Sequence, residues 1–286
     1  MAMKNPSVHT KLFFLLGYPL EHTFSPRMQN RAFDSLGMDC SYWPVEVSAE
    51  DLPVVFGGLK RMNTAGFNVT IPHKLRIMNL LDEIDPLAAA IGAVNTICMR
   101  DGKAVGYNTD GEGFVRNLEE GLGVTPAGKT VMLLGSGGAA RAIAMTLASR
   151  GARKVFICNR TRGTAEALAA EINGKIGNCA EAIPMETAFM AGVIPGCDIL
   201  VNCTSVGMHP DTDATPIDPG LLFRDIIVAD IVYNPRMTRL LSAARDAGCR
   251  YINGLGMLVY QGAEAFRLWT GVMPPVDAMF DATGRA

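Results

Sequence analysis

The sequence predicts an α/β protein of two domains, an N-terminal α/β domain and a Rossmann-type domain built on a doubly wound parallel sheet. Three observations support this. The chain has 286 residues, which is more than one hydrophobic core usually organises. Strand and helix patterns alternate regularly after residue 129, as repeated βα units do. A glycine-rich turn directly follows the first of these strands and opens a helix.

Composition excludes several classes of partner. Apolar residues make up 49% of the chain, charged residues 19%, and the net charge is −2 without a block of like charges. This argues against nucleic acid and against an anionic membrane surface. The seven cysteines form no CxxC pair and the four histidines are dispersed, so we expect reduced thiols and no metal site. No apolar run is long enough for a membrane helix or a signal peptide, so we expect a soluble, cytoplasmic protein. For its assembly we expect a monomer or a homodimer, between which the sequence does not discriminate.

The first hundred residues mix strands and helices. We expect a helix with Ser25 as N-cap and Pro26 at its first position, ended by Gly37. Asp101-Gly102 predicts the turn of a β-hairpin. Strands are expected at residues 12–17, 41–47, 66–71, 94–99 and 104–107, and a second helix at 52–62. The hairpin among parallel βα units implies mixed strand directions.

A domain boundary follows the helix predicted at 109–122, where the chain becomes the glycine- and proline-rich stretch GLGVTPAGK. Beyond it we expect strands at 130–134, 154–158, 199–202 and 226–230, and helices at 139–150 and 164–172. Two further helices, at 256–268 and 276–282, follow the last βα unit and are expected to return to the first domain. The predicted domains are 1–112 with 253–286, and 113–252.

The glycine-rich turn predicts a dinucleotide site. Gly135-Ser136-Gly137-Gly138-Ala139-Ala140 lies between a strand and a helix and matches the G-x-G-x-x-A form of the dinucleotide fingerprint. Gly135 permits the tight turn, and Gly137 lets the backbone approach a pyrophosphate at the helix N-terminus. A tight turn without a ligand is the alternative reading of this segment.

The end of the next strand indicates which dinucleotide binds. Sites that prefer NAD usually place Asp or Glu here, to hold the ribose 2′-hydroxyl. This chain has Asn159-Arg160-Thr161, followed by Arg162. A guanidinium and a hydroxyl suit a 2′-phosphate, which a carboxylate would repel. We therefore expect NADP, with NAD possible; a solvated basic turn is the alternative.

Polar residues in the first half gather at strand ends and turns. They occur in the segments HTFSP (22–26), NVTIPHK (68–74), GAVNT (92–96) and GYNTDG (106–111). Hydroxyls at a helix start, such as those of Thr23 and Ser25, could receive a carboxylate. Taken singly, each segment could also be a helix cap, a solvated lysine or turn chemistry.

Taken together, these motifs resemble the shikimate dehydrogenases in order and spacing. The set also includes GSGGAARA, NRT, NCTSVGM and NGLGMLVYQGAEAF, and the resemblance runs from about Gly17 to Gly271. It implies a catalytic pair, Lys74 and Asp110, in a substrate-binding domain next to an NADP-binding domain. The remaining implied roles are carboxylate binding by Thr23 and Ser25, contact with the ring hydroxyls by Thr70, Asn95, Asp110 and Gln261, a pocket wall at Tyr233, cofactor binding by residues 135–139 and 159–161, and a place near the nicotinamide for Gly254.

The chemistry agrees with these implied roles. Reducing a ring ketone to an alcohol requires a hydride on one side and a proton at the developing alkoxide, which a lysine ammonium can deliver. A carboxylate held by hydroxyls fits a small polyhydroxy acid. Family members usually have serine where this chain has Thr23, so the hydroxyl is kept and a methyl group is added.

The resemblance therefore leads to the reversible reduction of 3-dehydroshikimate to shikimate with NADPH, a step of chorismate and aromatic amino acid biosynthesis. Two alternatives remain open from the sequence. The segments VYNPRMTRLL and AFRLWTG resemble the broader quinate/shikimate dehydrogenases, which would oxidise quinate with NAD or NADP. A non-catalytic sensor of a shikimate-like ligand is the second alternative, although it would not need Lys74 beside Asp110.

Overall fold

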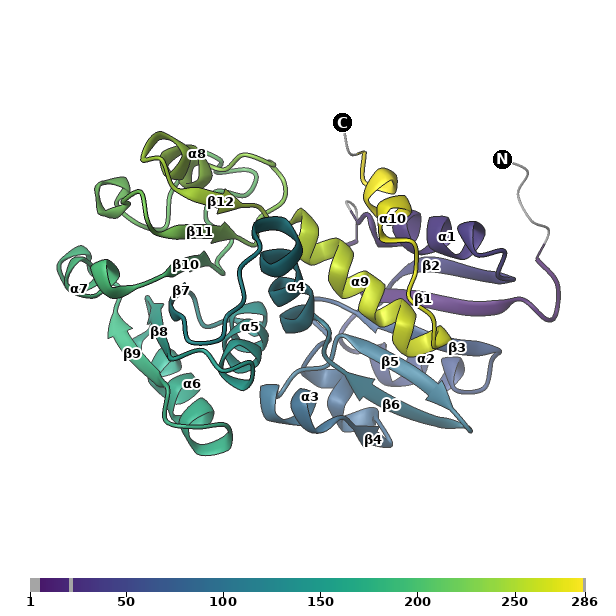
Figure 1. The fold of residues 1–286 in the computed structure, drawn as a ribbon. Coiled ribbons are helices and arrows are strands. Elements are labelled where there is room, and N and C mark those ends of the chain that lie inside the picture. The colour runs from purple at the N-terminus through teal and green to yellow at the C-terminus, as the bar shows by residue number, and fades with distance from the viewer. Residues whose placement is uncertain (1–5, 21–22, 285–286) are drawn as a thin grey trace. The chain divides into compact units, whose positions relative to one another are not determined.

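The computed structural model describes residues 6–20 and 23–284, so His22 of the HTFSP segment lies outside the described residues. The chain forms two compact units (Figure 1). Unit 1 comprises residues 1–109 and 259–286, and unit 2 comprises residues 110–258. The junctions thus lie after residues 109 and 258, where the sequence places them after 112 and 252.

Unit 1 contains a six-stranded mixed sheet in the order β2-β1-β3-β5-β6-β4. Its strands are β1 (Lys11–Gly17), β2 (Cys40–Glu46), β3 (Thr64–Val69), β4 (Glu83–Ile84), β5 (Thr96–Arg100) and β6 (Lys103–Tyr107). β1 pairs in parallel with β2 and β3, whereas β5 pairs antiparallel with β3 and β6. The hairpin prediction is confirmed, since Asp101 and Gly102 both have positive φ, at 49° and 78°.

Helices cover both faces of this sheet. One face carries α2 (Leu52–Leu59), α3 (Pro86–Ile91) and the 3₁₀ turn η1 (Arg76–Leu80), with Phe56, Phe67 and Ile77 in its core. The other face is aromatic: the Phe33 ring lies 5.0 Å from Phe13 and 4.8 Å from Phe266 of α9 (Leu255–Thr270). The predicted return of the C-terminal helices is therefore confirmed, and α10 (Val276–Ala282) packs on α1 (Ser25–Ser35).

The start of α1 differs from the prediction that Ser25 is its N-cap. Ser25 is already helical, Phe24 takes the N-cap position, and no side chain caps the helix there. Instead, the Thr23 hydroxyl accepts a hydrogen bond from the Ser25 backbone N–H at 3.2 Å. Proline fits the first turn because it lacks an N–H that would need a partner, so Pro26 lets the helix begin one residue earlier.

Unit 2 contains a six-stranded sheet that is parallel throughout, in the order β12-β11-β10-β7-β8-β9. Its strands are β7 (Thr130–Leu134), β8 (Lys154–Asn159), β9 (Ala180–Pro184), β10 (Ile199–Asn202), β11 (Ile227–Asp230) and β12 (Arg250–Ile252). This is the doubly wound order, in which strands are added on one side of β7 up to β9 and on its other side from β10 onward. The predicted Rossmann-type sheet is confirmed.

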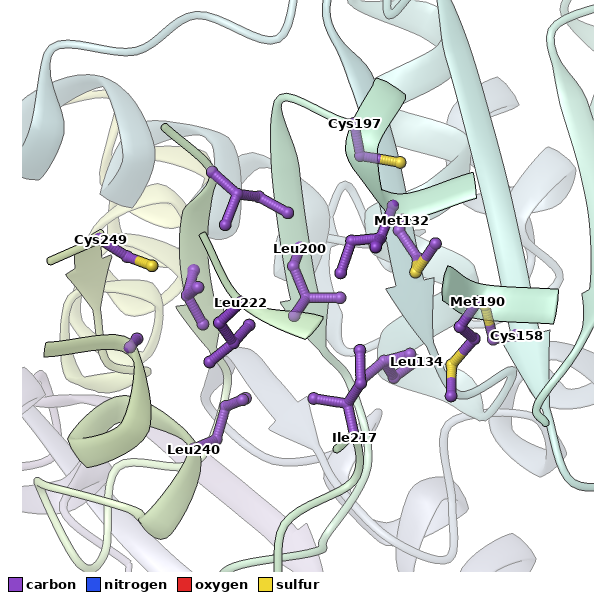
Figure 2. Packing of buried hydrophobic residues seen from close by; sticks show 14 of the residues in the cluster. Met132, Leu134, Cys158, Met190, Cys197, Leu200, Ile217, Leu222, Leu240 and Cys249 are labelled. Carbon is purple, nitrogen blue, oxygen red and sulfur yellow. The ribbon is translucent and has the colours of Figure 1, made fainter. Parts of the chain in front are cut away.

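The helices of unit 2 bury both faces of that sheet. They are α4 (Asp110–Leu122), α5 (Gly138–Ser149), α6 (Arg162–Lys175), α7 (Thr187–Val193) and α8 (Arg239–Asp246), with the short 3₁₀ turns η2 (Ile194–Gly196) and η3 (Pro219–Leu221). Figure 2 shows one of the two cores, where Met132, Leu134 and Leu200 of the sheet meet Met190 of α7 and Leu240 of α8. Burial of such side chains is the main stabilising contribution to a sheet of this kind.

Candidate active site and cofactor site

Three of the segments that carry predicted substrate residues lie at one edge of the unit 1 sheet. β1 and β3 run in parallel and end at this edge, at Gly17 and Val69. The antiparallel strand β5 begins here, because Thr96 pairs with Asn68 on one side and with Tyr107 on the other. The topology therefore brings segments 68–74, 92–96 and 107–109 to the same end of the sheet.

Asn95 is the centre of a buried hydrogen-bond network at this edge. It is 3% exposed, and its amide nitrogen donates to Thr109 Oγ1 at 3.0 Å and to Gln261 Oε1 at 3.4 Å. Its amide oxygen accepts from the Thr109 backbone N–H at 2.9 Å and from Thr96 Oγ1 at 2.9 Å. The structure thus joins two predicted residues, Asn95 and Gln261, across 166 positions of sequence.

A second layer supports this network from the core. Asn68 donates to the Asn95 carbonyl and to Thr96 Oγ1, both at 3.0 Å, and its oxygen accepts from the Tyr42 hydroxyl at 2.8 Å. Burial raises the pKa of the Tyr42 phenol well above its ordinary value of 10.0, so this hydroxyl stays a donor. Sequence reasoning did not single out Tyr42, Asn68 or Thr109 as site residues, although two of them belong to the motifs. Their role depends on contacts between strands that no local pattern reveals.

Lys74 is placed by a turn that follows β3. The Thr70 N–H donates to the Leu16 carbonyl at 2.9 Å, and the His73 N–H donates to the Thr70 carbonyl at 2.7 Å. The Lys74 carbonyl accepts from the Val94 N–H at 2.9 Å. The wholly buried His73 ring lies 2.8 Å from the Val47 carbonyl through Nε2, which ties the turn to the chain after β2. The lysine backbone is therefore fixed on both sides, with its side chain half-buried.

The other predicted residues lie as follows. Thr23 and Ser25 are partly exposed at the start of α1, which is anchored by Gln29 donating to the Gly262 carbonyl at 2.9 Å. Asp110 is 6% exposed and is the first residue of α4 and of unit 2, one peptide bond after Thr109. Its pairing with Lys74 would join residues of the two units and stays a prediction. Tyr233 lies between β11 and α8, and burial raises its pKa.

The glycine-rich loop of unit 2 takes the shape that the fingerprint predicts. Gly135 has φ +110°, and its N–H donates to the Cys158 carbonyl at 2.7 Å, closing the turn after β7. A side chain there would be strained, because φ in this range favours glycine. Gly137 precedes α5, and Gly138 and Ala139 are its first residues. The first backbone N–H groups of α5, which have no acceptor within the helix, therefore lie at this loop.

Ser136 is hydrogen-bonded to the first turn of α6, which follows β8. Its hydroxyl lies 2.8 Å from Thr164 Oγ1, which also accepts from Asn159 Nδ2 at 2.7 Å. Thr164 in turn donates to the Thr161 carbonyl at 2.8 Å. Sequence reasoning missed Thr164, which connects the predicted residues Ser136, Asn159 and Thr161. The only available signal was a hydroxyl in the first turn of α6.

Two arginines near this loop differ in their partners. Arg162 forms an ion pair with Glu166 at 2.6 Å, on the surface of α6. Arg160 is exposed and, within the described part of the chain, forms no hydrogen bond or ion pair. It borders a hollow of about 440 Å³ whose wall includes Met185, Met190 and Ile217. Arg160 therefore keeps its guanidinium available for an anion such as a 2′-phosphate.

Gly254 lies directly against the backbone that follows β11. A Cβ at this position would lie 1.9 Å from the Ile231 carbonyl oxygen, so no other residue fits without moving the backbone. The Gly254 N–H donates to the Val232 carbonyl at 3.1 Å. The loops that follow β11 and β12 are thereby packed against each other.

Two classes of site are not found among residues 6–20 and 23–284. No cluster of three or more His, Cys, Asp or Glu side chains that could hold a metal ion occurs there. In the same described residues, every helix is too short or too polar to cross a bilayer.

The fold and these two sites define an oxidoreductase that binds a dinucleotide. The chain belongs to the shikimate dehydrogenase family. Three family models match it: the shikimate dehydrogenase substrate binding domain over residues 15–97, shikimate / quinate 5-dehydrogenase over 120–210, and the shikimate 5′-dehydrogenase C-terminal domain over 254–282.

Relatives and solved structures agree with this membership. The chain is 47% identical over 277 residues to the shikimate dehydrogenase (NADP(+)) of Methanocaldococcus jannaschii, with 96% of each chain covered. The shikimate 5-dehydrogenase of Listeria monocytogenes, solved with shikimate and NAD, has a TM-score of 0.94 at 37% identity over 99% of both chains. The enzyme of Thermus thermophilus, solved with NADP(H) and shikimate, has a TM-score of 0.87 at 37% identity, covering 96% of this chain and 98% of that one.

Proposed function

We propose that this chain is a shikimate dehydrogenase that reversibly reduces 3-dehydroshikimate to shikimate with NADPH. The preference for NADP over NAD rests on Arg160, which follows β8, the second strand of the doubly wound sheet. Arg160 is exposed and has no acidic partner among the described residues. NAD is compatible as a weaker cofactor, since the residues that receive the pyrophosphate do not depend on the 2′-phosphate. The Listeria relative was solved with NAD.

Lys74 and Asp110 are the proposed catalytic pair. When bound, NADPH supplies the hydride to the carbonyl carbon. The Lys74 ammonium donates its proton to the carbonyl oxygen, and in oxidation the neutral amine takes that proton back. Asp110 orients the lysine and accepts a hydrogen bond from the same hydroxyl. The rigid turn described above supports this role, because general acid catalysis requires the donor to be held within hydrogen-bond reach.

In the proposed site the substrate is held by polar side chains, which are neutral except for Asp110. Thr23 and Ser25 bind the carboxylate, while Thr70, Asn95, Asp110 and Gln261 contact ring hydroxyls and Tyr233 lines the pocket. The hydrogen bonds that join Asn95 to Gln261 and Thr109 support this assignment, because they fix the amide groups before any ligand arrives. Such preorganisation reduces the free-energy cost of binding.

In this proposal the two units bind different ligands. Unit 1, which comprises residues 1–109 and 259–286, would bind the substrate through most of the residues named above. Unit 2, which comprises residues 110–258, would bind the cofactor through residues 135–139, 159–161 and Gly254. The sequence places these two domains at 1–112 with 253–286 and at 113–252. We also propose a cytoplasmic location, a monomer or homodimer, and no nucleic acid partner. The seven cysteines are all free, as expected in a reducing compartment.

A matrix of initial rates tests this function. Purified protein is assayed with shikimate or quinate against NADP⁺ or NAD⁺, and we expect the shikimate/NADP⁺ rate to be the highest of the four. A quinate/NAD⁺ rate above it would replace the proposal with a quinate dehydrogenase. Saturable shikimate binding without any cofactor reduction would instead favour the sensor.

A further inference from the structure

Asp230 is a buried carboxyl group at the end of β11 to which the proposed mechanism gives no role. It is 2% exposed, and its Oδ1 accepts from Asn202 Nδ2 at 2.9 Å and from the Val232 N–H at 3.0 Å. Its Oδ2 accepts from Thr238 Oγ1 at 2.6 Å. No cation pairs with it in the described residues. Burial raises the pKa of Asp230, and these three hydrogen bonds partly offset that effect.

Asn202 is the neighbour of Asp230 at the end of β10 and uses its amide fully. Besides Asp230, its nitrogen donates to the Val206 carbonyl at 3.2 Å. Its oxygen accepts from the Thr204 N–H at 3.0 Å and from the Thr204 hydroxyl at 2.7 Å. Thr204 Oγ1 in turn accepts from the Val206 N–H at 3.1 Å. One wholly buried side chain thus determines the conformation of the loop that follows β10.

Thr238 connects the same carboxylate to the next loop. Its hydroxyl donates to Asp230 and accepts from the Leu241 N–H at 3.3 Å, so it also caps α8. Val232 and Thr238 both bind Asp230, and therefore the segment between them, which carries Tyr233, is held at both ends. Asp230 and Asn202 together fix the loops after β10 and β11.

At the carboxyl ends of neighbouring strands, the aligned buried residues change from apolar to polar between β7 and β10. Across the strand ends the paired residues are Cys158, Leu134, Asn202 and Asp230, in that order. The first two are buried in the apolar core, whereas the last two are polar and wholly or almost wholly buried. Burying a carboxylate without a cation costs free energy, so packing alone gives no reason for it.

The position of Asn202 and Asp230 at the ends of β10 and β11 indicates their role. In a doubly wound sheet the two halves of a dinucleotide bind at the carboxyl ends of the two halves of the sheet. The loops after β7 and β8 take the pyrophosphate and the 2′-phosphate side, so the nicotinamide side falls to β10 and β11. The two sides are adjacent, since a Cβ on Gly135 would lie 3.1 Å from Thr204 Cγ2.

We propose that Asp230 and Asn202 are positioning residues that hold the loops at 203–206 and 231–238 in the shape that receives the nicotinamide half of the cofactor. This inference rests on the proposed dinucleotide-dependent function. It assigns to a buried polar pair a role that acts through two loops rather than through contact with the reacting atoms.

Substitution of Asp230 tests the proposal with a ligand that lacks the nicotinamide. Asp230→Leu keeps the branched shape of the side chain with a larger volume and removes all three acceptor contacts, whereas Asp230→Asn keeps the volume and retains an oxygen for Asn202 and Val232. We expect Asp230→Leu to weaken NADP⁺ binding about tenfold or more. Binding of adenosine 2′,5′-bisphosphate, which carries only the other half, should change less than about twofold on the same reasoning. Asp230→Asn should restore most of the loss. Parallel losses for both ligands in Asp230→Leu would overturn the proposal.

Turnover gives a second readout that a purely structural role would not move. With shikimate deuterated at the carbon that is oxidised, Asp230→Leu should show a larger isotope effect on kcat than wild type, because misplaced nicotinamide slows hydride transfer. An unchanged kcat and isotope effect would contradict the proposal. If Asp230→Leu does not fold, Thr204→Val replaces it, because Thr204 is partly exposed and valine is nearly isosteric with threonine. Binding of NADP⁺ and of adenosine 2′,5′-bisphosphate to this variant then tests the proposal. Wild-type protein without shikimate turnover would refute the proposed function, while the binding comparison would still test the positioning role.

Discussion

The two units differ at the sheet edges where we propose that their ligands bind. In unit 1 the hydrogen-bonded centre of the edge is buried, with Asn95 3% and Thr109 1% exposed and bonded to each other, while Lys74 is half-buried. In unit 2 the edge consists of backbone at Gly135–Ala139 and of exposed polar side chains such as Arg160. In the proposed function, the buried network of unit 1 therefore selects the substrate, and the solvent-exposed loop of unit 2 recognises the charge of the cofactor.

The largest expected effect concerns the chemistry on the unit 1 side. Lys74→Ala should reduce kcat by about 10²-fold or more, because it removes the proposed proton donor. Since Lys74 is half-buried and its backbone carries the turn, the thermal transition should stay close to that of wild type. Lys103→Ala, which removes an exposed lysine paired with Glu83, is the matched control and should retain full turnover. Near-normal kcat in Lys74→Ala would exclude the lysine from the mechanism.

The next effect concerns charge recognition in unit 2. Arg160→Ala should weaken NADP⁺ about 10- to 100-fold, because hydrogen bonds to a charged group contribute about 1.5–3 kcal/mol, and should leave NAD⁺ nearly unchanged. The KM values for both cofactors measure this. Arg162→Ala serves as the control: because Arg162 is already paired with Glu166, its substitution should change neither KM appreciably. Equal losses for both cofactors in Arg160→Ala would show that this residue does not bind the 2′-phosphate.

A smaller effect is expected from the layer beneath the unit 1 network. Tyr42→Phe leaves the oxygen of Asn68 without the donor that now lies 2.8 Å away. The free energy of unfolding should fall by about 1–3 kcal/mol, because a buried acceptor loses its partner. The KM for shikimate should rise while the KM for NADP⁺ does not. Denaturant unfolding and both KM values test this, and a larger change for NADP⁺ would contradict the separation between the units.

The smallest effect is a pH dependence at the surface of unit 1. The Ala104 N–H, and then Lys60, lower the pKa of Asp82 below its ordinary value of 3.8. A carboxyl group whose pKa is lowered in the folded state stabilises the protein above the ordinary pKa, and this contribution is lost as the pH falls through the folded value. Below pH 3.8, stability should therefore decline more steeply in wild type than in Asp82→Asn. Identical slopes in acid unfolding curves would contradict this.

Patterns along the chain predicted most of the elements but few of the contacts. The strands Thr130–Leu134 and Ile199–Asn202 and the helix Val276–Ala282 lie where they were expected, because apolar runs bounded by turn residues are local signals. The strands β9 and β12 were missed, since they are short edge strands of five and three residues with little apolar pattern. Helix α3 was also missed, although Asp85 caps it and Gly92 ends it with φ 72°.

The candidate site shows the same limit. Glycine-rich turns and hydroxyl-rich segments can be found in a sequence, and Gly135 has the positive φ that its tight turn implies. The role of Asn95 stays a prediction. The connections made by Thr164, Tyr42 and the Asp230–Asn202 pair were not predictable. They depend on which strand ends become neighbours, and that is decided by the topology of the sheets rather than by any local pattern.

The most direct test of the division between the two edges measures each ligand alone. Equilibrium Kd values for shikimate and for NADP⁺ are determined separately by calorimetry for wild type, Gln261→Ala and Arg160→Ala. We expect Gln261→Ala to weaken only shikimate and Arg160→Ala to weaken only NADP⁺. Either variant weakening both ligands to the same extent would contradict the account.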